Sequence, residues 1–131
     1  MDGMRFPSLH TGLALATKHV LDTFDADNVL FINSLLNITS FCDCWGFTTP
    51  SIVPDIGIMA SRKIMPIEKA SLDMIDADKF IEGSLPGHVT RHEEAGPHLL
   101  QQVWGQDPYT QIEAGEEMGL GSADYEIEEI E

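Results

Sequence analysis

Basic residues are scarce in this sequence. Seven Lys and Arg oppose 22 Asp and Glu, which gives a formal net charge of −15, and no Lys or Arg follows Arg91. A surface of this charge repels the phosphate backbone of nucleic acids and the anionic face of a membrane. We therefore expect neither nucleic acid nor a membrane among the partners.

Long apolar runs and cysteines are also few. No stretch reaches the ~20 apolar residues of a membrane-spanning helix, and the N-terminus lacks the basic and apolar regions of a signal peptide. The two cysteines lie only two positions apart, so they do not form a disulfide framework. These absences predict a cytoplasmic protein with reduced thiols.

The rest of the composition is that of a folded protein. Of the 131 residues, 43% are hydrophobic and 22% are charged, values that argue against wholesale disorder. This length predicts one domain over residues 1–131.

The spacing of apolar residues predicts the main elements. Helical periodicity indicates helices over Leu13–Phe24 and Pro66–Ile75. Val29–Asn33 and Asp55–Ala60 are short apolar runs, typical of strands buried on both faces in a parallel sheet. Further along the chain we expect a loop or insertion at 79–97, short helices at His98–Trp104 and Pro108–Met118, and a last edge strand at Tyr125–Ile130.

These elements predict an α/β fold with a small, mainly parallel or mixed sheet flanked by helices. Three strands make a thin sheet, because sheets usually contain about four to six. The sequence therefore indicates an incomplete version of a larger fold.

The segment Cys42-Asp43-Cys44-Trp45 is the best candidate for chemistry. Residues i and i+2 of an extended backbone point to the same side, so Cys42 and Cys44 would offer two sulfurs to one soft metal. Asn37 and Asp43 would stand behind these ligands and orient them. Two readings remain open: the cysteines are small hydrophobic core residues, or Cys44 is the reactive thiol of an enzyme, for which we identify no base.

The number of cysteines limits the kind of metal site. An iron–sulfur cluster usually takes four cysteine ligands, and this chain has two. We therefore expect at most one metal per chain, or one shared between chains.

His88, His92 and His98 match no zinc motif in their spacing and are expected on the solvated surface. Asp55, which follows a proline, is either a carboxylate in a cleft or a turn cap.

Several blocks follow one another along most of the chain: Leu30–Thr39, Cys42–Trp45, Ile52–Ser61, Lys69–Asp73 and Glu117–Glu126. In this order they resemble a family of uncharacterised iron–sulfur centre proteins, a domain of unknown function. The chain departs from the family pattern at Lys63–Glu68, where relatives carry an Asp-Pro pair and Glu68 replaces a later Asp.

The resemblance implies iron or an iron–sulfur cluster as cofactor and a redox or metal-binding function. Members of the family are considerably longer, with an amino-terminal α/β portion and, in many, a ferredoxin-like module that carries its own cysteines. The chain would then correspond to their C-terminal part. It would form a homo-oligomer or bind a partner chain that supplies the amino-terminal half. The alternative function is a non-catalytic structural or binding half-domain that completes a fold with such a partner.

Overall fold

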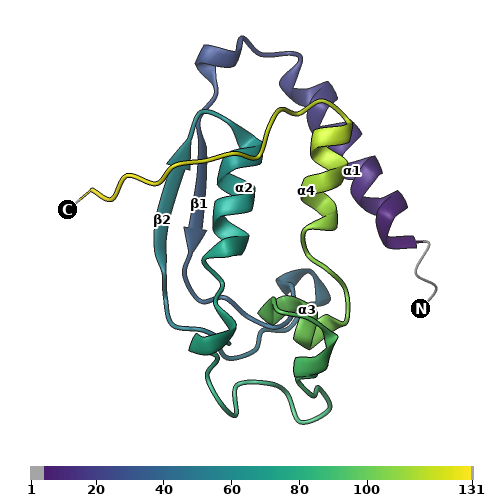
Figure 1. Ribbon diagram of the computed structural model, residues 1–131, viewed down its shortest axis with the longest axis vertical. Coiled ribbons are helices and arrows are strands. Elements are labelled where there is room, and N and C mark those ends of the chain that lie inside the picture. Colours follow the sequence, from purple (N-terminus) through teal and green to yellow (C-terminus); the bar gives the residue numbers. More distant parts are fainter. Residues whose placement is uncertain (1–4, 131) are drawn as a thin grey trace. The chain divides into compact units, whose positions relative to one another are not determined.

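The computed structural model describes residues 5–130, without the side chains of residues 5–7 and Asp43. Its helices and strands, labelled in Figure 1, are α1 (Arg5–Leu21), β1 (Phe31–Leu35), β2 (Gly57–Ser61), α2 (Ile64–Asp73), α3 (Leu99–Trp104) and α4 (Thr110–Glu117). Single 3₁₀ turns lie at Ala26–Asn28, Asp43–Trp45, Ala77–Lys79 and Glu93–Ala95. The fold is therefore mixed α/β, and none of the helices within residues 5–130 is long and apolar enough to cross a membrane.

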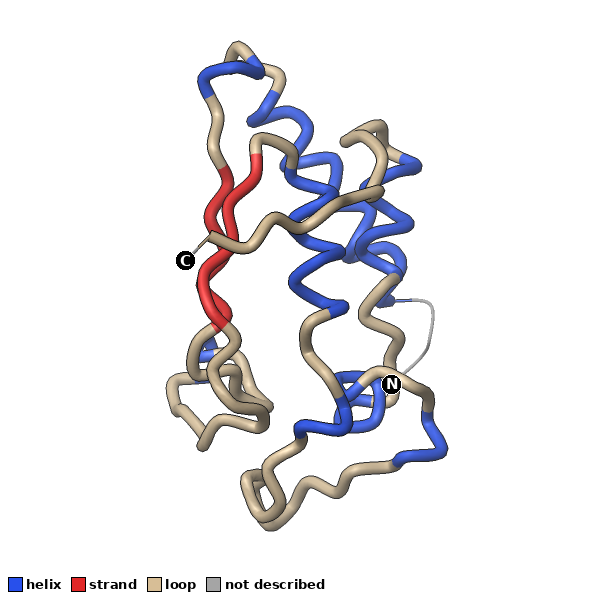
Figure 2. The backbone as a smooth tube through the Cα atoms, turned by 60° about the vertical axis from the view of Figure 1, so that its left-hand side comes forward, coloured by secondary structure: helices blue, strands red, loops and turns tan. Residues whose placement is uncertain are grey.

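The sheet is a pair of antiparallel strands, which corrects the mainly parallel or mixed sheet expected from the sequence. Figure 2 shows β1 and β2 side by side. Beyond the strands, the Ile56 N–H donates to the Leu35 carbonyl at 2.9 Å, and Thr39 and Ser51 form an antiparallel bridge. A parallel pair needs a crossover, usually a helix. Residues 36–56 contain only one 3₁₀ turn, so they return as a long hairpin loop.

The strands are not buried on both faces, as their apolar sequences suggested. Burial alternates along β1 and β2, and Ile32 and Ile58 expose 61% and 69% of their surface. Such alternation is typical of antiparallel strands with one covered face. The prediction was wrong because apolar side chains also occupy the solvent-exposed face of the strands.

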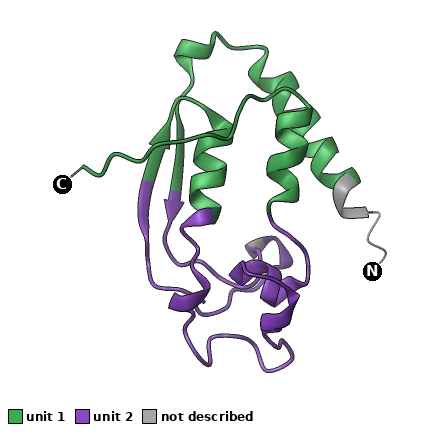
Figure 3. Ribbon diagram, in the orientation of Figure 1, with its two compact units in different colours: residues 1–33, 59–72, 109–131 green, residues 34–58, 73–108 purple. Residues whose placement is uncertain are grey.

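The chain divides into two compact units, shown in Figure 3. The first contains the described residues of 1–33, 59–72 and 109–131, and the second contains 34–58 and 73–108. Both strands pass from one unit into the other.

Polar contacts join β1 to α2 in unit 1. The Asn33 side chain donates to Glu68 Oε1 at 3.1 Å and to Ser71 Oγ at 2.9 Å, and the Ser71 hydroxyl donates to the Ile67 carbonyl at 2.6 Å. On the other side of the unit, α1 packs against α4. The helix expected at Leu13–Phe24 begins earlier and ends at Leu21.

The last strand expected from the sequence is absent from the described residues. Tyr125–Ile130 is coil. The preceding residues are held by a hydrogen bond from the Ala123 N–H to Glu116 Oε1 at 2.7 Å. Lys69 Nζ lies 5.5 Å from the ring centres of both Tyr109 and Tyr125, so a cation–π contact anchors the tail instead of a strand partner.

Unit 2 has its own apolar core and a well-anchored loop. The core residues are Ile52, Val53, Ile75, Leu99 and Val103. Residues 80–92, within the expected loop at 79–97, contain no helix or strand. Gln102 ties the loop to α3, since its Nε2 donates to the Gly96 carbonyl at 2.8 Å and its Oε1 accepts from Arg91 Nε at 2.7 Å.

Replacing Ile52 with Ala should lower the free energy of unfolding by about 2–5 kcal/mol, because this side chain is 0% exposed in the core of unit 2. Ile81→Ala is the matched control. It removes the same atoms from an exposed side chain in the same unit and should cost clearly less. Urea unfolding followed by circular dichroism measures both, and equal losses would contradict the core assignment.

Candidate functional site

The cysteines lie in a loop whose base is closed by strand-like pairing. Thr39 and Ser51 form an antiparallel bridge, and the Ile52 N–H donates to the Ile38 carbonyl at 2.8 Å. Just inside this base, the buried Ser40 hydroxyl lies 3.3 Å from the Thr49 hydroxyl. Residues 40–50 are therefore held at both ends.

Asn37 fixes the outer end of this base. Its φ of 51° lies in the left-handed region, which Asn tolerates better than most residues. Its N–H donates to Asp55 Oδ1 and its Oδ1 accepts from the Ser51 hydroxyl, both at 2.7 Å. Asp55 thus bonds across the loop base to a residue 18 positions away, so this contact is not the local turn cap that the sequence suggested. These contacts of Asn37 fix the loop base, so Asn37 would orient the cysteines through the position of the loop.

The cysteines themselves lie on a 3₁₀ turn, not on the extended backbone expected. The Trp45 N–H donates to the Cys42 carbonyl at 3.1 Å, and the Cys44 N–H points at Cys42 Sγ at 3.3 Å. Both thiols are exposed to solvent, so the reading of two core cysteines is wrong. The side chain of Asp43 lies outside the described residues.

An aromatic cluster adjoins the turn in sequence. The Phe41 ring packs edge-on against Trp104 with centres 4.7 Å apart, and its centre lies 5.4 Å from Phe47 and 6.0 Å from the His88 ring. The cluster as a whole could not be predicted from the sequence, because its members come from three separate segments. Phe41 and Phe47 are two of the three aromatic residues within residues 40–50, and this density of aromatic residues is the sequence signal that could have indicated part of the cluster.

The described side chains do not complete a metal site. Among them, no group of three His, Cys, Asp or Glu is placed to hold one ion. His98, expected on the surface, is buried and caps α3 by accepting from the Leu100 N–H at 3.1 Å. Cys42 and Cys44 thus supply at most two ligands from this part of the chain.

His92 and Glu94 form a separate exposed pair with Nδ1 and Oε1 3.3 Å apart. The pKa of Glu94 is lowered, first by a backbone hydrogen bond at Glu94 and then by His92. This pair is a surface contact on a single turn and brings in no further ligand.

Both cysteines should react with a maleimide in the native protein, because both thiols face solvent. Mass spectrometry should count two labels on the wild type and one on each of Cys42→Ser and Cys44→Ser. The same protein unfolded in urea gives the upper limit of the labelling rate. Labelling that occurs only after unfolding would contradict the exposed turn.

Comparison with protein-family models, with curated proteins and with solved structures finds no match to the chain.

Proposed function

We propose that the Cys42-Asp43-Cys44 turn is the soft-metal site of a redox or metal-binding module of the iron–sulfur centre type. The observation that carries the proposal is the turn itself, on which two exposed thiols stand two residues apart in a loop closed at its base. The sequence resemblance to the iron–sulfur centre family points in the same direction. Location in the cytoplasm would keep both thiols reduced.

Three considerations support thiolate ligation at this turn. Thiolates select soft ions such as Zn²⁺, Cu⁺ and iron in clusters. The Cys44 N–H aimed at Cys42 Sγ is the kind of outer contact that tunes metal–thiolate centres. The closed base reduces the conformational entropy lost when a metal orders the loop.

Two thiolates are half of the usual cluster set, so the remaining ligands must come from elsewhere. A second copy of the turn or a partner chain would supply them. We propose no catalytic reaction for Cys44.

Anaerobic Co²⁺ titration should give a thiolate-to-cobalt charge-transfer band with the wild type. Cys42→Ser and Cys44→Ser should each weaken the band and the affinity by at least about tenfold, since a lost thiolate leaves one ligand. Thr48→Ala changes an exposed side chain in the same loop and should leave both unchanged. A band that survives in the double Cys→Ser variant would remove the proposed site.

A second proposal concerns the exposed apolar side chains on and beside the strands. They favour the alternative function, a half-domain that completes its fold with a partner chain. In unit 1, Leu30 and Ile32 are exposed, and in unit 2 so are Leu36 and Ile58. Each strand of a two-stranded sheet also leaves one edge without a strand partner in the described chain. Exposed apolar surface of this kind marks interfaces.

We propose that another chain covers these positions. A symmetric homodimer is the simplest arrangement. The alternative, which rests on the family resemblance, is a partner chain that supplies the amino-terminal α/β half. Either arrangement would also bring further ligands within reach of the thiols if its contact includes the loop.

Association should tighten as salt rises, because the charge of −15 opposes self-contact and about 0.1 M salt screens it beyond ~10 Å. Light scattering at several salt concentrations measures the mass. Ile58→Asp should weaken association, whereas Ile127→Asp, which adds the same charge to an exposed tail position, should not. A 14.5 kDa species under all conditions, without binding of a hydrophobic dye, would contradict the proposal.

A further inference from the structure

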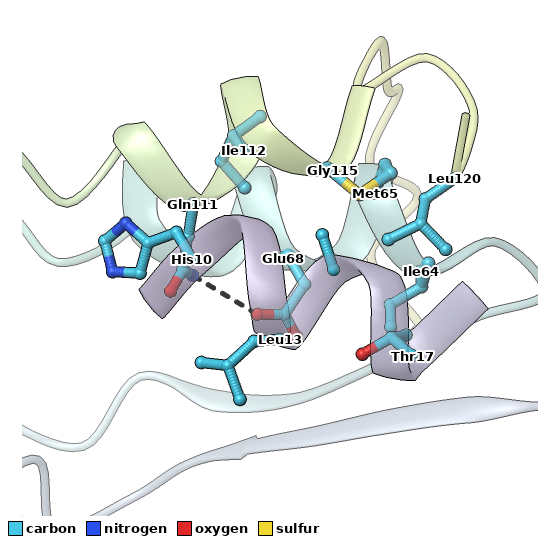
Figure 4. A pocket seen from close by; sticks show the side chains of 11 residues that line it. His10, Leu13, Thr17, Ile64, Met65, Glu68, Gln111, Ile112, Gly115 and Leu120 are labelled. Atoms are coloured by element: carbon cyan, nitrogen blue, oxygen red, sulfur yellow. Dashed lines mark hydrogen bonds between the residues drawn. The ribbon is translucent and has the colours of Figure 1, made fainter. Parts of the chain in front are cut away.

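Unit 1 contains a cavity of about 160 Å³ between α1, α2 and α4, far in sequence from the cysteine loop (Figure 4). Its apolar walls are formed by Leu13, Ile64, Met65, Ile112 and Leu120. An engineered cavity of about 150 Å³ in another protein accepts benzene. The cavity therefore has the size for a compact body of roughly six heavy atoms.

Among the polar lining residues, which include His10, Thr17 and Gln111, Glu68 is the one that carries a carboxylate. Glu68 Oε1 accepts from the Asn33 amide at 3.1 Å, which fixes the side chain from the β1 side. Glu68 Oε2 accepts from Gln111 Nε2 at 3.5 Å, the dashed line in Figure 4. That distance is longer than the 2.7–3.2 Å of a good N–H···O bond. A carboxylate has about four acceptor positions, so Glu68 keeps capacity for a further donor.

The charge around Glu68 favours a cationic donor. No Lys or Arg is among the described lining residues. Lys69, the nearest base in sequence, is drawn to the rings of Tyr109 and Tyr125. His10 lines the cavity, with its Nδ1 2.8 Å from the Thr110 hydroxyl. The net charge of −15 also raises the local concentration of small cations at the surface.

We propose that this cavity binds a small organic ammonium ion. The ammonium group donates to Glu68 Oε2, and an apolar body of about benzene size lies against the aliphatic walls. Leu13 and Ile112 contact this body from α1 and α4. This binding site is independent of the thiol site, because all its lining residues belong to unit 1.

Gly115 keeps the cavity in its present shape. A Cβ at this position would lie 2.5 Å from the terminal methyl of Met65 and 2.6 Å from its sulfur. Both atoms are at the end of a flexible side chain, so Gly115→Ala would displace the tip of Met65 without moving backbone. Because Met65 lines the cavity, this change alters the apolar wall and leaves Glu68 in place.

The test compares benzylamine with its neutral isostere benzyl alcohol by NMR titration of the wild-type protein. Benzylamine should bind at least about tenfold more tightly, because its ammonium group forms an ion pair with the Glu68 carboxylate in addition to the hydrogen bond that either ligand can donate. Glu68→Gln should remove this preference while retaining an acceptor for Asn33. Glu113→Gln removes the same charge from an exposed position of α4 and should leave it intact.

Gly115→Ala should weaken benzylamine and benzyl alcohol together, because it changes the shared apolar wall. The comparison of the two ligands needs only the wild type, so it holds even if a variant fails to fold. Equal affinity for the two ligands, binding of neither, or an ammonium preference that persists in Glu68→Gln would each overturn the proposal.

Discussion

The pairing that closes the loop over residues 40–50 is the constraint on which the thiol site depends. Ordering the backbone of one residue costs about 1–2 kcal/mol, so an unanchored loop of this length would spread its two sulfurs over many arrangements. Two sets of contacts offset this entropy cost during folding. They are the bridge between Thr39 and Ser51 and the two hydrogen bonds of Asn37. The antiparallel direction of the strands makes this possible, because it brings both ends of the loop to the same place.

Unit 1 is constrained in a comparable way by polar groups that are mostly half-buried. Asn33 lies in a strand of mostly apolar residues, and its side-chain amide donates to Glu68 and Ser71, both of which belong to α2. Each hydrogen bond contributes only about 1 kcal/mol, but a shifted helix would lose both bonds of Asn33 together. The network therefore selects one register of α2 on β1. It also fixes the carboxylate that faces the cavity.

Several elements could be predicted from the sequence because their signals are local. The helix expected at Pro66–Ile75 is found at Ile64–Asp73, and the helix expected at Pro108–Met118 is found at Thr110–Glu117, followed by Gly119 at a φ of 81°. The placement of both cysteines in an irregular loop likewise followed from the Asn, Thr and Trp around them.

The direction of the sheet could not be predicted in this way. Val29–Asn33 contains four apolar residues in five positions, which is typical of a fully buried strand, yet Ile32 is exposed. Whether an apolar side chain is covered depends on what packs over it, and this is not a local property of the sequence. The cavity around Glu68 could not be predicted for the same reason, because three helices and a loop contribute its lining.

The exposed apolar side chains on the strands indicate a further role for the acidic composition, which is protection against aggregation. Ile32 and Ile58 are exposed apolar side chains on strands, and surface of this kind promotes aggregation between protein molecules. Mutual repulsion between molecules of charge −15 slows such encounters without closing the surface to a matched partner. The acidic residues then act as gatekeepers against aggregation. This protection would fade towards the isoelectric point near 4.4, where the carboxylates that provide it take up protons.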